Sequence, residues 1–172
     1  MRKSMVAITM ALFLLISTQA GFAQSTTTAD TGINSTVYMA WQPFEFGVMV
    51  WFQDTDQIWV LDSGTTTDED GDTVASGNGT VTVYSDAFSD GSSTSIDSDG
   101  CSLTPVRGFG LVWDSIGGSG SLGCPLANEI GYETGGRVDS ATYSLEILGP
   151  GNTRYGVDIS GSSGTWQTIS YN

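Results

Sequence analysis

The sequence predicts a mainly β protein: an antiparallel sheet or sandwich of short strands and hairpins, with one short helix near residues 105–116. Apolar and polar residues alternate over residues 143–148 and again over residues 155–159, which is the period of strands with one solvent-facing side. Gly, Asp and Ser punctuate the chain at short intervals from residue 37 onward, as they do between short strands. A helical spacing of apolar residues interrupts this pattern between residues 105 and 116.

The first 23 residues are predicted to be a signal peptide. Arg2 and Lys3 form a positive n-region, and residues 5–16 are an apolar run too short to span a bilayer comfortably. Residues 21–23 (GFA) place small residues at the −3 and −1 positions of a cleavage site. An uncleaved N-terminal anchor is the less favoured alternative. Export predicts a secreted protein that acts outside the cell or at the cell surface.

Residues 24–36 (QSTTTADTGINST) are predicted to be a Ser/Thr-rich tail. Ile33 is the only large apolar residue of this segment, so burial cannot offset the entropy lost on ordering it. The apolar pattern begins after the tail, and residues 37–172 are therefore predicted to form a single β-rich domain. A chain of this length is sufficient for one domain with its own core.

The first predicted hairpin covers residues 44–61 (FEFGVMVWFQDTDQIWVL), in which two apolar runs flank a polar turn. Side chains alternate between the two faces of a strand, so the even-numbered residues of 44–52 share one face. That face carries only Phe and Val residues and is predicted to be core.

The other face of this strand carries Trp51, and two interpretations stay open. In the first, Trp51 and Trp59 form a platform for sugar rings, while Glu45 and Gln53 bind the hydroxyl groups. In the second, which we favour because large aromatics are more often buried, the helix or a second sheet covers the strand on both faces. A three-residue loop would place Trp51 opposite Trp59 and a two-residue loop would place Phe52 there, so the register is also open.

Further strands are predicted from β-branched and aromatic content at residues 80–84 (TVTVY) and 165–171 (TWQTISY). A second hairpin is predicted over residues 143–159, with its turn at residues 149–153 (GPGNT). This hairpin resembles the one at residues 48–61 in length and pattern. The chain can therefore be organised as two related hairpins, although chance similarity explains the likeness about as well.

The helix is predicted to begin near Pro105, which suits the first helical position, with Thr104 as its cap. The apolar residues at helical spacing are Val106, Phe109, Val112, Trp113 and Ile116. Gly108 and Gly110 cost roughly 1 kcal/mol each relative to Ala. We therefore expect packing and a neighbouring disulfide to hold the helix.

Cys101 and Cys124 are the only two cysteines in the chain. In an oxidising compartment two thiols pair more often than they stay free, and their wide spacing does not suit a redox role. A structural disulfide is predicted, worth about 3 kcal/mol in the chain-entropy model.

The charge of the chain is strongly negative, with 19 acidic residues against five basic residues and no His. Nucleic acids and anionic membranes are bound through Lys and Arg, so neither is expected as a partner. Without His, and with Lys3 as its only Lys, the chain offers no Ser-His-Asp set, no Cys-His pair and no His-based zinc site. Two carboxylates could still hydrolyse a glycoside, but the spacing of Glu45, Glu129, Glu133 and Glu146 pairs none of them, and the protein is predicted not to be an enzyme.

The acidic loops are the candidate metal sites, and no other cofactor is predicted. Asp68, Asp70 and Asp72 offer oxygen ligands for Ca²⁺ in a pattern that resembles the start of an EF-hand. The chain is not an EF-hand, because Gly71 precedes the third Asp and Gly79 stands where a bidentate Glu is required. Solvated loops without a metal are the favoured interpretation.

Residues 122–125 (LGCP), followed by Glu129, by residues 135–137 (GGR) and by the run 141–147, resemble the LGFP repeat of bacterial cell-surface and wall-associated proteins. Residues 44–51 (FEFGVMVW) are similar to the F-x-x-G-x-x-x-W half of such a repeat. The third position of LGCP is Cys where the family has Phe, and the second half of the chain lacks a clean F-x-x-G. The resemblance covers about a third of the predicted mature chain and implies a non-catalytic envelope module that contacts glycan.

The predicted function is therefore that of a secreted, non-catalytic module associated with the cell envelope, which binds glycan through an aromatic strand face. The first alternative is a structural subunit of an extracellular filament or sheath, favoured by the Ser/Thr/Gly-rich composition and by a tail that can add to a neighbour's sheet edge. The second is a Ca²⁺-binding surface domain. The expected partner is envelope glycan or another copy of the chain.

Overall fold

A computed structural model describes residues 35–67, 70–71, 73–89 and 96–170 of the chain. The predicted signal peptide and all but the last two residues of the predicted tail lie outside the described residues. Those last two residues, 35 and 36, belong to the first strand rather than to a tail.

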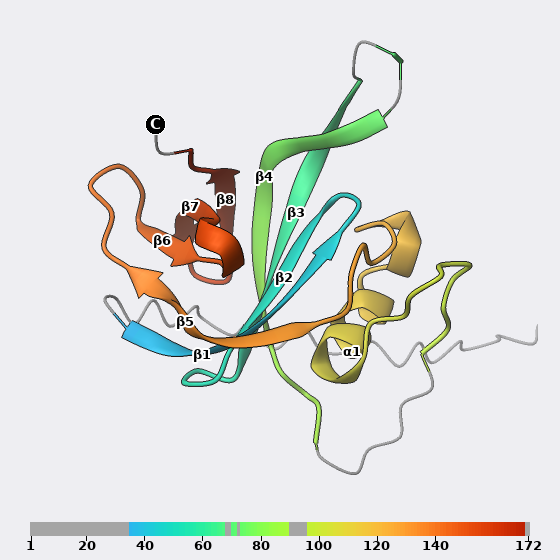
Figure 1. The fold of residues 1–172 in the computed structure, drawn as a ribbon, viewed down its shortest axis with the longest axis horizontal. Helices are drawn as coiled ribbons and strands as arrows, with labels where there is room; N and C mark the ends of the chain where they lie inside the picture. The colour runs from blue at the N-terminus through green and yellow to red at the C-terminus, as the bar shows by residue number, and fades with distance from the viewer. Residues whose placement is uncertain (1–34, 68–69, 72, 90–95, 171–172) are drawn as a thin grey trace, which may run out of the picture.

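In the described part of the chain, eight strands form one antiparallel sheet that closes into a barrel (Figure 1). The strands are β1 (Ser35–Phe44), β2 (Gly47–Phe52), β3 (Gln57–Thr67), β4 (Thr73–Ser85), β5 (Ile130–Val138), β6 (Leu145–Leu148), β7 (Arg154–Ser160) and β8 (Ser163–Thr168). The helices are α1 (Arg107–Ser115) and the 3-10 turns η1 (Gly118–Gly120) and η2 (Pro150–Asn152). The prediction of a mainly β, antiparallel fold with one short α-helix is confirmed. Closure of the sheet adds a feature that the prediction did not contain.

The barrel consists of two meanders of four strands. The strand order around it is β1-β2-β3-β4-β8-β7-β6-β5, so β1 to β4 form the first meander and β5 to β8 the second. Pairing of β1 with β5 and of β4 with β8 joins the meanders at both edges. The connection from β4 to β5 carries α1, which lies on the right of the barrel in Figure 1, whereas β6 to β8 lie on the left. The helix therefore packs on the side of the first meander.

Both predicted hairpins are present, and the two hairpins occupy equivalent places in the two meanders. The second pairs β6 with β7 in the register Leu145↔Val157, and the predicted strands near residues 80–84 and 165–171 correspond to β4 and β8. In the first, the turn between β2 and β3 has four residues, so Trp51 pairs with Ile58 and Val50 pairs with Trp59. Both predicted registers for this hairpin are wrong.

The strand predicted over residues 44–52 is interrupted. β1 ends at Phe44 and β2 begins at Gly47, with a turn between them. As a result Phe44 belongs to the apolar cluster outside the barrel, whereas Val48 and Phe52 belong to the cluster inside it. The even-numbered residues of 44–52 therefore do not share one face.

The barrel interior is packed with apolar side chains from both meanders, and this cluster includes Trp59, Phe52, Leu145, Tyr155 and Trp166. The indole of Trp59 is fully buried and meets the Phe52 ring edge to face, with 5.6 Å between ring centroids. Burial of large aromatic rings is the main source of core stability in a domain of this size.

A second apolar cluster lies outside the barrel, between α1 and the outer face of β1, β2 and β3. Met49 and Ile58 from the sheet pack there with Phe109 and Trp113 from α1. The strands β2 and β3 are thus covered on both faces, as the favoured interpretation of residues 44–61 required. In a hairpin with one solvent-facing side, the outer residues would be polar. Here they are apolar because they contact the helix.

The helix begins two residues later than predicted. Val106 occupies the N-cap position without a side-chain hydrogen bond, so the expected cap by Thr104 and start at Pro105 are wrong. The predicted disulfide is present: Cys101 and Cys124 are joined, with 5.5 Å between their Cα atoms. It links the segment before α1 to the segment after η1 and so ties both ends of the helical region together.

Candidate functional site

A cavity of about 410 Å³ lies between the first turn of α1 and the outer face of the first meander. We refer to it as the α1 cavity. Its aromatic lining residues are Tyr38, Trp51, Phe88 and Phe109, and its charged lining residues are Asp56, Asp86, Arg107 and Glu129. The volume falls within the range of small-molecule sites in proteins.

Two aromatic rings form one wall of the α1 cavity. Tyr38 on β1 is 41% exposed and meets the half-buried Trp51 on β2 edge to face, with 6.4 Å between ring centroids. Trp51 packs on the outer apolar cluster, and its Nε1 donates a hydrogen bond of 3.2 Å to Oδ1 of Asp56. The hydroxyl end of Tyr38 lies across Gly131 of β5, where an added Cβ would come within 1.9 Å of Oη. Both rings are therefore fixed in place while keeping part of their surface open.

The charged residues reach the cavity from four separate segments. Asp86 directly follows β4, and its backbone N–H donates to the carbonyl oxygen of Asp56 in the β2–β3 turn at 2.9 Å. Glu129 precedes β5, and Arg107 begins α1. Nη1 of Arg107 lies 3.7 Å from Oε1 of Glu129, but the arginine side chain is 68% exposed, so this ion pair adds little stability. The arginine is positioned to donate to a ligand.

Burial changes the acid chemistry of two of these carboxyls. Desolvation raises the pKa of Asp86; the backbone N–H of Phe88 opposes this rise, and the negative charge of Asp56 adds to it. Desolvation also raises the pKa of Glu129; the Arg107 charge opposes the rise, and the Asp86 charge adds to it. Each carboxylate thus senses another negative charge, and the pair holds protons more readily than two exposed carboxyls would.

Two of the four described non-Gly residues with a positive φ line the α1 cavity; Asp99 and Asn152 lie outside it. Asp56 and Arg107 both have a φ of 52°, in the left-handed region that few residues other than Gly adopt. Such conformations cluster at functional sites, where the surrounding structure enforces them.

Only part of the predicted sugar platform is present. Trp51 lines the α1 cavity, but Trp59 points into the barrel interior and is fully buried. Because Trp51 pairs with Ile58, the two Trp side chains point to opposite faces of the sheet. The prediction of a shared Trp51–Trp59 platform is wrong, and Tyr38 is the ring that Trp51 meets instead.

The two predicted polar partners lie elsewhere. Glu45 sits in the β1–β2 turn, where its Oε2 accepts a hydrogen bond from the backbone N–H of Cys124 at 3.0 Å. Gln53 is exposed in the β2–β3 turn, and its backbone N–H donates to the carbonyl of Tyr38. Neither lines the α1 cavity. Glu45 instead helps to hold the disulfide segment against the barrel.

The other predicted carboxylates are dispersed. Asp70 is exposed, and Asp68 and Asp72 lie outside the described residues. Within the part of the chain that the structure describes, no group of three or more His, Cys, Asp or Glu side chains could hold a metal ion. Of the four glutamates considered for glycoside hydrolysis, Glu129 is the one that lines the α1 cavity.

Tyr38, Asp86 and Arg107 are among the cavity residues that the sequence analysis did not single out as site residues. They stand 48 and 21 positions apart in the chain, and the pairing of strands β1 to β4 and the return of α1 onto the barrel bring them together. No local motif carries that information. Two signals were present in the sequence: the aromatic ring of Trp51 on a strand and Glu129 as a candidate hydrolytic carboxylate.

Comparisons with known proteins identify no relative: no family model matches the chain, and neither the curated proteins nor the solved structures gave a match. The resemblance to the LGFP repeat therefore depends on its sequence motifs alone. Among the described residues, no helix has both the length and the apolar character needed to cross a membrane.

Proposed function

We propose that the protein is exported and binds a neutral glycan of the cell envelope in the α1 cavity, without catalysing a reaction. The observation that carries this proposal is the joint presence of two partly open aromatic rings, Tyr38 and Trp51, and four charged side chains in one cavity. The resemblance of residues 122–147 to an envelope repeat supports the location.

The chemistry of the cavity suits a sugar. The C–H faces of a sugar ring pack on aromatic surface, and its hydroxyl groups donate to carboxylates and accept from a guanidinium. Asp56 and Asp86 supply acceptors and Arg107 supplies donors at the cavity wall. The net charge of −14 favours a neutral glycan over an anionic one.

Binding can be tested by titration with soluble chitotetraose, cellotetraose and maltotetraose, and by co-sedimentation with isolated cell-wall glycan. Tyr38→Ala removes an exposed ring at little cost in stability, and Glu129→Gln removes one charge while keeping the shape of the side chain. Both variants should lose binding by about tenfold or more. Asp114→Asn, which removes an exposed carboxylate of α1 outside the cavity, is the control and should bind normally. Unchanged binding by Tyr38→Ala and Glu129→Gln would refute the site.

A glycoside hydrolase is the second candidate, because Asp86 and Glu129 line the same cavity as the aromatic rings and both have a raised pKa. Hydrolysis needs one protonated carboxyl beside one ionised carboxylate. Reducing ends released from the same tetrasaccharides would measure it. Release that disappears in Glu129→Gln would favour the enzyme, and a silent assay with intact binding agrees with our proposal.

Export is tested separately from binding. Mass spectrometry of protein recovered from the culture medium should show a chain that begins at Gln24. A secreted chain that retains Met1, or a protein found only inside the cell, would contradict the proposed signal peptide.

A further inference from the structure

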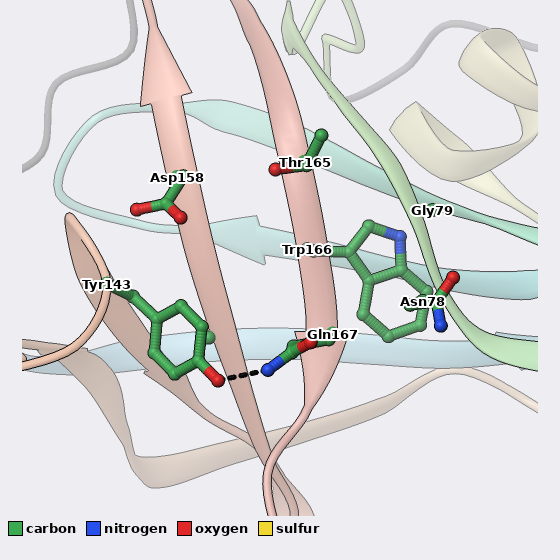
Figure 2. A pocket seen from close by; sticks show the side chains of 8 residues that line it. Asn78, Gly79, Tyr143, Asp158, Thr165, Trp166 and Gln167 are labelled. Atoms are coloured by element: carbon green, nitrogen blue, oxygen red, sulfur yellow. Dashed lines mark hydrogen bonds between the residues drawn. The ribbon is translucent and has the colours of Figure 1, made fainter.

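We propose that a second pocket, on the outer face of β4, β8 and β7, binds a single neutral sugar residue. This pocket has a volume of about 270 Å³ and shares no lining residue with the α1 cavity. The pocket is built from the second meander and from the part of β4 that pairs with β8, away from the helix (Figures 1 and 2). The proposal stands on these residues and does not require the first site.

The floor of the pocket is a row of outward-facing positions across three strands. Asn78 on β4 pairs with Gln167 on β8, and Gln167 pairs with Gly156 on β7. Residues that pair directly across strands point to the same face of a sheet. Trp166, the neighbour of Gln167 in sequence, belongs to the interior cluster, so the row formed by Asn78, Gln167 and Gly156 lies outside the barrel.

One wall of the pocket is the ring of Tyr143, which lies on the backbone of Gly156. An added Cβ at Gly156 would come within 2.4 Å of the ring, so only glycine permits this contact. The phenol oxygen is joined to Nε2 of Gln167 by a hydrogen bond (Figure 2). Tyr143 thus presents a flat apolar surface in a fixed orientation, which lowers the entropy cost of stacking a ligand.

The loop that carries Tyr143 is held in place by its own hydrogen bonds. The backbone N–H of Tyr143 donates to Oγ of Ser140 at 3.1 Å, and the backbone N–H of Ser144 donates to Oδ1 of Asp158 at 2.8 Å. The wall of the pocket is therefore pre-organised in the free protein.

Polar groups surround the ring in the arrangement that a sugar needs. Asp158 uses Oδ1 for the loop, and its Oδ2 has no hydrogen-bond partner within the described residues. Gln167, Asn78 and Thr165 are exposed and add amide and hydroxyl groups around the same opening. The lining contains a carboxylate and no basic residue, which disfavours an anionic ligand. The structure therefore assigns a neutral sugar residue to this pocket.

Two sites on different sides of one barrel would let the protein engage two segments of a polymeric glycan at once. Binding of the second segment then becomes intramolecular, and the overall affinity for insoluble glycan exceeds that for a short oligosaccharide.

The test is an NMR titration of the folded protein, with assigned backbone and side-chain amide signals, against chitotetraose, cellotetraose and maltotetraose. At least one of the three should shift the Gln167 side-chain amide and the Gly156 amide in a saturable manner. Tyr143→Ala should weaken this response by about tenfold or more and leave shifts at Trp51 and Tyr38 unchanged. Tyr143→Phe keeps the ring and should retain the response. If Tyr143→Ala does not fold, Gln167→Ala, at an exposed position, replaces it.

Each outcome separates this proposal from the first. Shifts at Trp51 and none at Gln167 or Gly156 would overturn the second site and keep the α1 cavity as the glycan site. Shifts at Gln167 and Gly156 alone would support the second site and overturn the first. No shift at either place with all three oligosaccharides would overturn both sites. A response of the Gly156 amide that Tyr143→Ala and Gln167→Ala leave unchanged would overturn the second site.

Discussion

The two meanders of the barrel differ in which of their faces are covered. In the first, β2 and β3 are apolar on both faces, because one face fills the barrel and the other packs against α1. In the second, β7 and β8 alternate: Tyr155, Val157 and Trp166 point inward, whereas Asp158, Thr165 and Gln167 are exposed. The helix thus converts half of the barrel wall into an internal layer and leaves the other half with a polar outer row.

This difference explains why the two similar hairpins have such different compositions. They occupy equivalent positions in the two meanders, yet only the first carries apolar residues such as Met49 and Ile58 on its outer face. A strand that reads as a continuous apolar run is one that is covered twice, and an alternating strand is one that is covered once. The α1 cavity lies on the face covered by the helix, and the pocket beside Tyr143 lies on the solvent-exposed outer face of β4, β8 and β7.

The largest effect is expected inside the barrel, where both meanders contribute. Trp59→Ala should reduce the free energy of unfolding by about 3 to 5 kcal/mol, because it leaves a large cavity among packed rings. Chemical denaturation of the variant and of the native protein measures the loss. A change below about 1 kcal/mol would show that Trp59 is not in the core and would reopen the sugar platform.

The comparison itself is tested by one substitution on each outer wall. Ile58→Ala, beneath α1, should cost about 2 to 5 kcal/mol, whereas Thr165→Ala, on the outer face of β8, should lie within about 0.5 kcal/mol of the native protein. Denaturant midpoints with equal m-values provide the measurement. Equal costs at the two positions would mean that both walls are covered, or that neither is.

The disulfide should stabilise the helical side more than the second meander. Replacing Cys101 and Cys124 by Ser together should cost about 3 kcal/mol, since the bridge closes a loop with a sequence separation of 23. Amide hydrogen exchange should then rise first in α1, while β6 to β8 keep their protection until global unfolding. A uniform increase over the whole barrel would show that the two walls do not unfold separately.

The sequence was sufficient for whatever depends on local pattern. Alternation predicted the β6–β7 hairpin. The cysteine count, with the expectation of an oxidising compartment, predicted the disulfide. The two-sided apolar run predicted that β2 and β3 are covered. Registers depend on turn length, and the four-residue turn after Phe52 has no unique signature, so both predicted pairings failed.

Barrel closure was out of reach for a different reason, because it depends on contacts between distant segments. Arg137 shows this well: its side chain is fully buried, lies over the Phe52 ring at 4.5 Å and pairs with Asp54 at 2.6 Å. From sequence alone, an arginine that follows two glycines would be expected at the surface. Its burial depends on the pairing of β5 with β1. The α1 cavity was missed in the same way, since its residues come from β1, β2, β3, α1 and three connecting segments.

The smallest expected effect is the pH dependence of stability that comes from the carboxyls of the α1 cavity. It tests whether this cavity, beside the helix, is shielded from water in a way that the pocket beside Tyr143 is not. Burial raises the pKa of Asp86 above its ordinary value of 3.8, with Asp56 adding to the rise and Arg107 and Glu129 nearby. Below that ordinary value the carboxyl is protonated in both the folded and the unfolded protein, so it costs nothing. As the pH rises through the raised pKa, the folded protein must ionise a partly desolvated group and loses stability.

Asp86→Asn should therefore match the native protein in stability near pH 3 and be more stable at pH 7, because the amide keeps an acceptor for the Phe88 N–H without the charge. The gain should stay below about 1 kcal/mol, since Asp86 is only half-buried and solvent screens its charge. Denaturation midpoints across this pH range measure it, with Asp114→Asn as the control for net charge. A gain that is the same at both pH values would mean that Asp86 ionises as freely as an exposed carboxyl, and the α1 cavity would then be open to water like the pocket beside Tyr143.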